Sequence, residues 1–195
     1  MKRIVKSLFF TGLAMALAFP SISQVRIPGT DPVSTDMKKV IKEYPHHFSK
    51  LQGSVIEENP QTVSYACNFE VRGAESSSIT RYSSKANDVF SWQATMLTTE
   101  DFDVAKKKFR SLFNSLNNLS VKMDYGDTFY LSGKYETPTE ERKFTTIVMS
   151  FEKADRITQK MKLELSMQYE MLEWKIRVAI YEKDREDDEQ GETIE

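Results

Sequence analysis

The stretch MKLELSMQYEMLEWKIRVAI, residues 161–180, decides the fold. Apolar and polar side chains alternate over residues 161–169, and the alternation resumes in a new phase over residues 174–180, which predicts two strands. A loop of four residues, 170–173, joins these strands in one antiparallel register. That register pairs Tyr169 with Trp174, Met167 with Ile176, Leu165 with Val178, Leu163 with Ile180, Gln168 with Lys175 and Ser166 with Arg177. A single strand bulged at Met171 and Leu172 is the alternative, but its length would far exceed that of an ordinary strand.

Shorter runs elsewhere in the chain show the same period of two residues. Apolar side chains alternate with polar ones in five further segments, at residues 63–71, 77–83, 90–96, 129–135 and 147–151. Together with the hairpin, these segments predict an antiparallel sheet of six to eight strands. Gly73 lies between the first two segments, and we expect a turn there.

Two other segments have the period of an amphipathic helix. The first can be capped by residues 34–36, and its apolar stripe is Met37, Val40, Ile41, Tyr44, Phe48 and Leu51. Pro45 interrupts this stripe, so we expect a kink or two short helices. The second can be capped by Thr98 or Thr99, and its stripe is Phe102, Ala105, Phe109, Leu112, Phe113, Leu116 and Leu119.

These patterns predict an α+β fold in which both helices pack on one face of the antiparallel sheet and the opposite face stays partly open. The two halves of the chain also resemble each other faintly, since FSKL at residues 48–51 aligns with FNSL at residues 113–116. This similarity indicates an internal α-β-β-β duplication, although shared amphipathic patterning explains it equally well without common descent.

The two ends of the chain differ in composition from the part between them. Residues 1–23 carry a basic start, an apolar run and small residues at 21 and 23, which predicts a cleaved secretory signal peptide. Residues 24–33 hold two prolines and a glycine without periodicity and predict an extended leader. Residues 184–195 predict an acidic disordered tail, which leaves a single domain at residues 34–183. We therefore expect export to a bacterial periplasm or to the extracellular space, with no transmembrane anchor after cleavage.

Charge and cysteine content restrict the classes of partner. The whole chain has a net charge of −2, and loss of the signal would remove three basic residues and no acidic one, which leaves −5. This excess argues against nucleic acid or anionic lipid as the main partner. Cys67 is the only cysteine, so no internal disulfide can form, and its strand phase predicts a buried, inert thiol.

The usual catalytic groups are scarce in this sequence. His46 and His47 are adjacent, so they cannot form the metal-binding pair of histidines spaced by four residues. We find no motif of a phosphate loop, a metal site or a serine triad, and we expect no cofactor. Hydrolysis by two carboxylates stays open, because it needs only two acids at a suitable separation. Candidate acids are Glu57, Glu58, Glu70, Asp124, Asp127 and Glu164.

The functional prediction therefore depends on which side chains the folded protein exposes on its surface. Tyr82, Tyr130 and Tyr181 fall on the strand phase opposite the main apolar set, which predicts that they lie on the open face and contact a partner. We expect a non-catalytic exported binding or scaffold protein that uses this face or a sheet edge to hold a protein partner or an apolar ligand. The alternatives are a carboxylate-dependent hydrolase of envelope or extracellular polymers, and a small carrier with a methionine-lined cavity.

Overall fold

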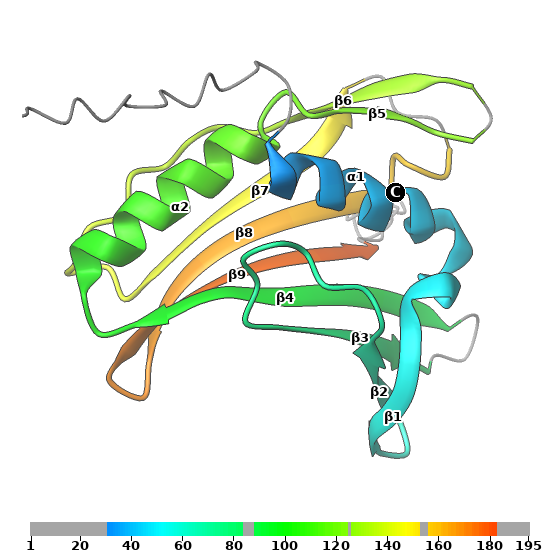
Figure 1. Ribbon diagram of the computed structural model, residues 1–195, viewed down its shortest axis with the longest axis horizontal. Coiled ribbons are helices and arrows are strands. Elements are labelled where there is room, and N and C mark those ends of the chain that lie inside the picture. Colours follow the sequence, from blue (N-terminus) through cyan, green and yellow to red (C-terminus); the bar gives the residue numbers. More distant parts are fainter. Residues whose placement is uncertain (1–30, 84–87, 125, 153–155, 183–195) are drawn as a thin grey trace, which may run out of the picture.

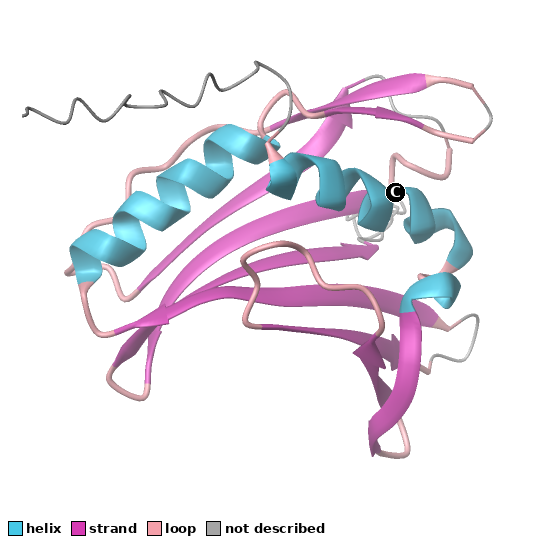
Figure 2. Cartoon of the chain, in the orientation of Figure 1, coloured by secondary structure: helices cyan, strands magenta, loops and turns pink. Residues whose placement is uncertain are grey.

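Nine strands form one open antiparallel sheet in the computed structural model, which describes residues 31–83, 88–124, 126–152 and 156–182 (Figure 1). The strand order is β1-β2-β3-β4-β9-β8-β7-β6-β5, and the two α-helices of this part of the chain cover one face (Figure 2). The strands are β1 (Gln52–Glu58), β2 (Thr62–Cys67), β3 (Ser76–Tyr82), β4 (Val89–Thr99), β5 (Ser120–Lys122), β6 (Thr128–Ser132), β7 (Phe144–Glu152), β8 (Met161–Glu170) and β9 (Glu173–Glu182). The α+β class and the antiparallel sheet are as predicted.

Several predictions concern residues outside this description. The signal peptide at residues 1–23, most of the leader and the acidic tail at residues 184–195 all lie outside the described residues. Of the helices within the described ranges, none is long and apolar enough to cross a membrane.

The hairpin of β8 and β9 has the predicted register in all six pairs, but its loop is shorter than predicted. Glu170 pairs with Glu173, so the loop consists of Met171 and Leu172 alone. These two residues have φ angles of 51° and 68°. Two consecutive positive φ angles are typical of a type I′ turn, whose twist matches that of the strands it joins. The four-residue prediction was wrong because such turns usually contain asparagine and glycine, and neither occurs here.

Replacing Met171 by asparagine and Leu172 by glycine should raise the free energy of unfolding by about 1–2 kcal/mol, because these residues tolerate the left-handed conformation that other side chains resist. The two native side chains are 90% and 76% exposed, so the change removes no core packing. Urea unfolding of both proteins measures the difference. The control variant M171A/L172A keeps the backbone strain and should gain little, and an equal gain in that control would contradict the explanation.

Two edge strands that the sequence pattern did not predict raise the total above six to eight. β1 carries its apolar residues Val55 and Ile56 side by side, and both are more than half exposed. Its pairing with β2 also shifts register twice, so it lacks a regular alternation. β5 is only three residues long. β1 therefore lacks the period of two residues by which the inner strands are recognised, and β5 alternates over too few residues for that period to predict a strand.

The first helix, α1 (Pro32–Glu43), begins two residues before the predicted start of the domain. Its N-cap is Asp31 and not a residue at 34–36, because the Asp31 side chain accepts a hydrogen bond from the Val33 amide at 3.3 Å. Pro32 occupies the first helical position, where a missing amide hydrogen costs nothing. The predicted break at Pro45 is confirmed, since a 3₁₀ turn, η1 (Tyr44–His46), follows α1.

The second helix, α2 (Phe102–Leu116), buries the predicted face but has a different cap. Its N-cap is Asp101, whose carboxylate accepts a hydrogen bond from the Val104 amide at 3.0 Å. Thr98, one of the two predicted caps, instead donates from its amide and its hydroxyl to the carboxylate of Glu75, at 2.8 and 2.7 Å.

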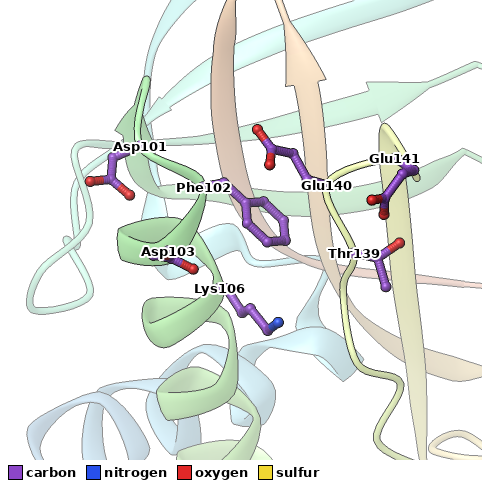
Figure 3. A pocket seen from close by; sticks show the side chains of 7 residues that line it. All are labelled: Asp101, Phe102, Asp103, Lys106, Thr139, Glu140 and Glu141. Carbon is purple, nitrogen blue, oxygen red and sulfur yellow. The ribbon is translucent and has the colours of Figure 1, made fainter.

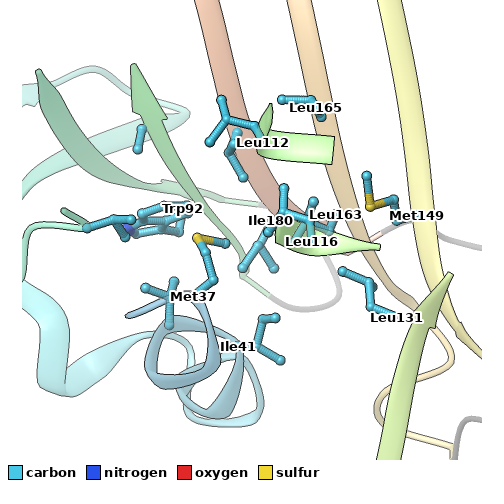
Figure 4. Packing of buried hydrophobic residues seen from close by; sticks show 14 of the residues in the cluster. Met37, Ile41, Trp92, Leu112, Leu116, Leu131, Met149, Leu163, Leu165 and Ile180 are labelled. Carbon is cyan, nitrogen blue, oxygen red and sulfur yellow. The ribbon is translucent and has the colours of Figure 1, made fainter. Parts of the chain in front are cut away.

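The core lies between the two helices and the sheet (Figure 4). Trp92 of β4 is fully buried near Met37 of α1, and Leu112 and Leu116 of α2 lie over the strands of the second half. Six of the seven methionines within the described residues are buried here: Met37, Met96, Met123, Met149, Met161 and Met167. These thioethers fill the core and do not line an open groove.

The sheet has the arrangement that two repeated halves would produce. β4 and β9, the last strands of the two halves, pair with each other at the centre of the sheet. Each half begins with an edge strand and continues strand by strand toward this central pair. One helix precedes the strands of each half, and both helices lie on the same face. The second half has one strand more than the first. Descent from a duplication stays a hypothesis.

An ion pair ties α1 to the loop between β2 and β3. Asp36 is 4% exposed, and its carboxylate accepts hydrogen bonds from the amide, Nε and Nη2 of Arg72, at 3.1, 2.7 and 3.1 Å. These hydrogen bonds from Arg72 are the main cause that lowers the pKa of Asp36. Gly73, the next residue, has a φ of 79° and forms the predicted turn.

Candidate functional site

The helix-free face of the sheet presents the polar residues that alternate with the core residues along each strand, and we call it the outer face. Across its centre, the pairings place Ser78, Gln93, Ala179 and Glu164 in one row that crosses β3, β4, β9 and β8. Short hydroxyl and amide side chains dominate this row and its neighbours. A surface lined by such polar side chains suits a polar ligand better than an apolar one.

A hollow of about 370 Å³ lies on the outer face beside β4. Tyr82 from β3 and Tyr181 from β9 both line it, with β4 between their strands. The full lining is Tyr82, Val89, Ser91, Gln93, Glu164, Ala179, Tyr181 and Glu182. Two of the three predicted contact residues therefore meet at one place.

Tyr181 and Glu164 interact directly inside this hollow. The hydroxyl of Tyr181 donates a hydrogen bond to Oε2 of Glu164 at 3.3 Å. Burial raises the pKa of Tyr181, and the charge of Glu164 and this hydrogen bond raise it further. The phenol therefore stays protonated near neutral pH and donates its hydrogen bond to the Glu164 carboxylate, which also lines the hollow.

Tyr130, the third predicted contact residue, lies apart from the other two. It stands on β6, where it pairs with Glu152 and is 55% exposed. It does not line the hollow, from which β8 and β7 separate its strand. Its position agrees with the predicted strand phase, but the structure does not bring it to the site.

Two exposed apolar residues on the outer face were missed by sequence analysis. Phe144 and Val148 of β7 pair with Gln168 and Glu164, and they are 50% and 48% exposed. Both fall on the phase opposite Ile147, so the alternation that revealed the strand could also have revealed them. They extend the apolar contact area of the outer face beyond the tyrosines.

An ion cluster lies toward the hairpin end of β8 and β9. Arg177 contacts the Glu170 carboxylate through both terminal nitrogens, with Nη1 2.9 Å from Oε1. Nζ of Lys175 lies 3.9 Å from Oε2 of the same carboxylate. The Arg177 hydrogen bonds are the main cause that lowers the pKa of Glu170. The cluster joins two cations to one carboxylate, so it keeps one positive charge where it borders the outer face.

A separate acidic hollow of about 510 Å³ lies at the start of α2 (Figure 3). It is lined by Asp101, Phe102, Asp103, Lys106, Thr139, Glu140 and Glu141. The Asp101 carboxylate caps the helix, and Nζ of Lys106 lies 5.4 Å from the centre of the Phe102 ring. Figure 3 shows the carboxylates spread around the hollow and not converging on one point. In the part of the chain that the structure describes, no group of three or more acids, histidines and cysteines could hold a metal ion.

The catalytic candidates are not brought together. His46 and His47 are both exposed, and Nε2 of His46 lies 3.9 Å from the Asp124 carboxylate. Cys67 is half-buried and not fully buried as predicted, and its thiol donates a hydrogen bond to the Phe69 carbonyl at 3.1 Å.

Carboxyl groups also give little support to catalysis. Of the candidate acids, only Glu164 lines a hollow described above. Among the described residues, every carboxyl whose pKa departs clearly from its ordinary value is lowered: Asp31, Asp36, Glu141 and Glu170. A carboxylic acid that donates a proton near neutral pH needs a raised pKa.

Comparison of the chain with protein-family models and with curated proteins finds no match. The functional argument therefore depends on the geometry of the outer face.

Proposed function

We propose that the protein is an exported, non-catalytic binding or scaffold protein that holds a partner protein on its outer face. The convergence of Tyr82, Tyr181 and Glu164 on one open hollow carries this proposal. Tyrosine rings add contact area at a low cost in side-chain entropy and keep a hydroxyl for hydrogen bonding. Ser91 and Gln93 supply further hydrogen-bonding groups beside them. The basic and apolar start of the chain supports export to a periplasm or to the extracellular space.

The lining of the hollow supports a protein partner more than an apolar ligand or a carrier role. Most of its lining residues carry a polar or charged group, and only Val89 and Ala179 are purely aliphatic. A carrier of apolar ligands needs an enclosed, mostly apolar cavity. The methionines that could have lined such a cavity fill the core instead.

A hydrolytic role has less support, although two carboxylates line the hollow. Glu164 accepts the hydrogen bond of Tyr181, and Glu182 lies 3.0 Å from Nζ of Lys160. Each carboxylate thus has a donor of its own, whereas a hydrolase needs one of its two acids to donate a proton to the substrate. This arrangement favours binding over catalysis.

A photoreactive residue at position 91 tests the proposal, because it would lie inside the hollow. A partner captured in cells through this position should not be captured through position 110 on α2, which lies on the opposite side of the sheet. With the purified partner, the variant Y82A/Y181A should raise Kd at least about tenfold, since aromatic residues at the centre of an interface typically contribute most of its affinity. Calorimetry measures Kd.

The matched control is Y130A, which also removes one exposed tyrosine from a strand of the outer face. We expect its Kd to stay within about threefold of the wild type, as for a residue at the rim of an interface. An unchanged Kd in Y82A/Y181A, or equal capture through positions 91 and 110, would contradict the proposal.

A further inference from the structure

A basic hollow of about 480 Å³ lies between α1 and the hairpin of β5 and β6, and we call it the lysine groove. Its lining consists of four lysines and three hydroxyl side chains: Thr35, Lys38, Lys39, Lys42, Ser120, Lys122 and Thr128. None of these residues is acidic, although the chain as a whole carries a net charge of −2. Lysines gathered in this way repel one another, so the groove favours an anionic occupant.

Most of this charge is not neutralised by the surrounding structure. Lys39 lies 3.8 Å from Asp36, a carboxylate that Arg72 already binds. Within the described ranges, Lys38, Lys42 and Lys122 form no ion pair. Lys38 and Lys42 are half-buried and four residues apart on α1, and like charges at this spacing destabilise a helix. An anion in the groove would remove this repulsion.

We propose that the acidic segment at residues 183–195 of the same chain binds in the lysine groove. This segment contains seven acidic and two basic residues. Its charge is complementary to that of the groove, whose lining is basic and polar throughout. Because the segment is covalently attached, its effective concentration at the groove is on the order of millimolar, which favours it over a free anion of equal affinity.

The positions of the strand ends show that the acidic segment is long enough to reach the lysine groove. Glu182 ends β9 and pairs with Met161, which begins β8. The antiparallel order then brings the end of β7, the start of β6 at Thr128 and the end of β5 at Lys122 to this same end of the sheet. Four strand spacings separate β9 from β5, a distance of about 19 Å. The 13 residues that follow Glu182 can extend about 40 Å, so the span is no obstacle.

Carbodiimide crosslinking of the purified full chain tests the proposal, because it joins a carboxylate to an amine only where the two are in contact. Tryptic mass spectrometry should find residues 184–195 joined to Lys38, Lys42 or Lys122. Lys106, Lys107 and Lys108 of α2 form a reference cluster of three lysines elsewhere on the surface, and Lys106 lines the acidic hollow at the start of that helix. We expect at least about threefold fewer links to these lysines, and loss of the preference in 1 M salt, which screens such contacts.

Three matched variants separate binding from mere reactivity, with the yield at the unchanged Lys122 as the measurement. K38Q/K42Q removes two charges from the groove and should lower the Lys122 yield about threefold. K38R/K42R keeps both charges and should preserve the yield, and K106Q/K107Q removes two charges elsewhere and should also preserve it. Circular dichroism checks that all the variants are folded.

Two results would overturn the proposal. One is an equal yield at the groove lysines and at the reference cluster. The other is a set of links that joins separate molecules, which a mixture of ¹⁴N-labelled and ¹⁵N-labelled chains would reveal.

Discussion

Replacing Trp92 by alanine will lower the free energy of unfolding by about 3–5 kcal/mol, the range observed for loss of a large aromatic side chain from a core. Trp92 is fully buried and lies on β4, next to the central pairing of β4 with β9. It pairs with Ile79 on one side and with Ile180 on the other, so the cavity would open where the two halves of the sheet meet. Urea unfolding measures the loss, which is a large share of the stability of a typical domain.

The matched control is W92F, which keeps an aromatic ring and leaves a smaller cavity than alanine does, so it should cost only about 1–2 kcal/mol. Within the described part of the chain, Nε1 of Trp92 has no hydrogen-bond partner. Phenylalanine therefore removes no hydrogen bond and relieves a buried unpaired donor, which partly offsets the loss of volume. A loss in W92F equal to that in the alanine variant would contradict this explanation.

The second large effect is expected at Asp36, where replacement by asparagine should cost about 1.5–3 kcal/mol near neutral pH. Asparagine has nearly the same size as aspartate, but it carries no charge and can accept at one oxygen only. The variant would therefore lose part of the hydrogen bonding that Asp36 receives from Arg72. D103N, at an exposed position on α2, is the control and should change stability by less than about 0.5 kcal/mol.

The difference between the wild type and D36N should depend on pH in a defined direction. The pKa of Asp36 is lowered in the folded protein, so the unfolded chain binds the proton first as the pH falls. The stabilisation is therefore complete above the unfolded pKa, about 4, and is lost as the pH falls through the folded pKa. We expect the difference between the two proteins to shrink below about pH 4, and a constant difference would contradict the ion pair as its cause.

Most of the fold could be predicted because its inner strands carry strict alternation. The pairing of β8 with β9 follows from the sequence alone, since one register satisfies the apolar and the polar faces at once. The turn at Met171 and Leu172 could not be predicted, because its residues contradict the usual chemistry of a type I′ turn. Asp31 was missed as a cap because the prolines around it resemble an irregular leader, although Pro32 suits the start of a helix.

The candidate site could be predicted only in part. Strand phase placed Tyr82, Tyr130 and Tyr181 on one face, but phase says nothing about which of them are neighbours. The meeting of Tyr82 with Tyr181 depends on the pairing of β4 with β9, two strands that lie far apart in the chain. The lysine groove could not be predicted either, because Lys38 and Lys122 lie far apart in the chain and only the fold brings them together.

The two margins of the sheet differ in shape, and both oppose pairing with a second copy of the chain. At one margin β1 is bent by its register shifts and carries Glu57 and Glu58, which would repel the same strand of a second copy. At the other margin β5 offers three residues only, and α1 lies against it. The unpaired backbone groups of β1 follow an irregular path, and those of β5 are few. Both features disfavour the edge-to-edge pairing of copies from which fibres grow.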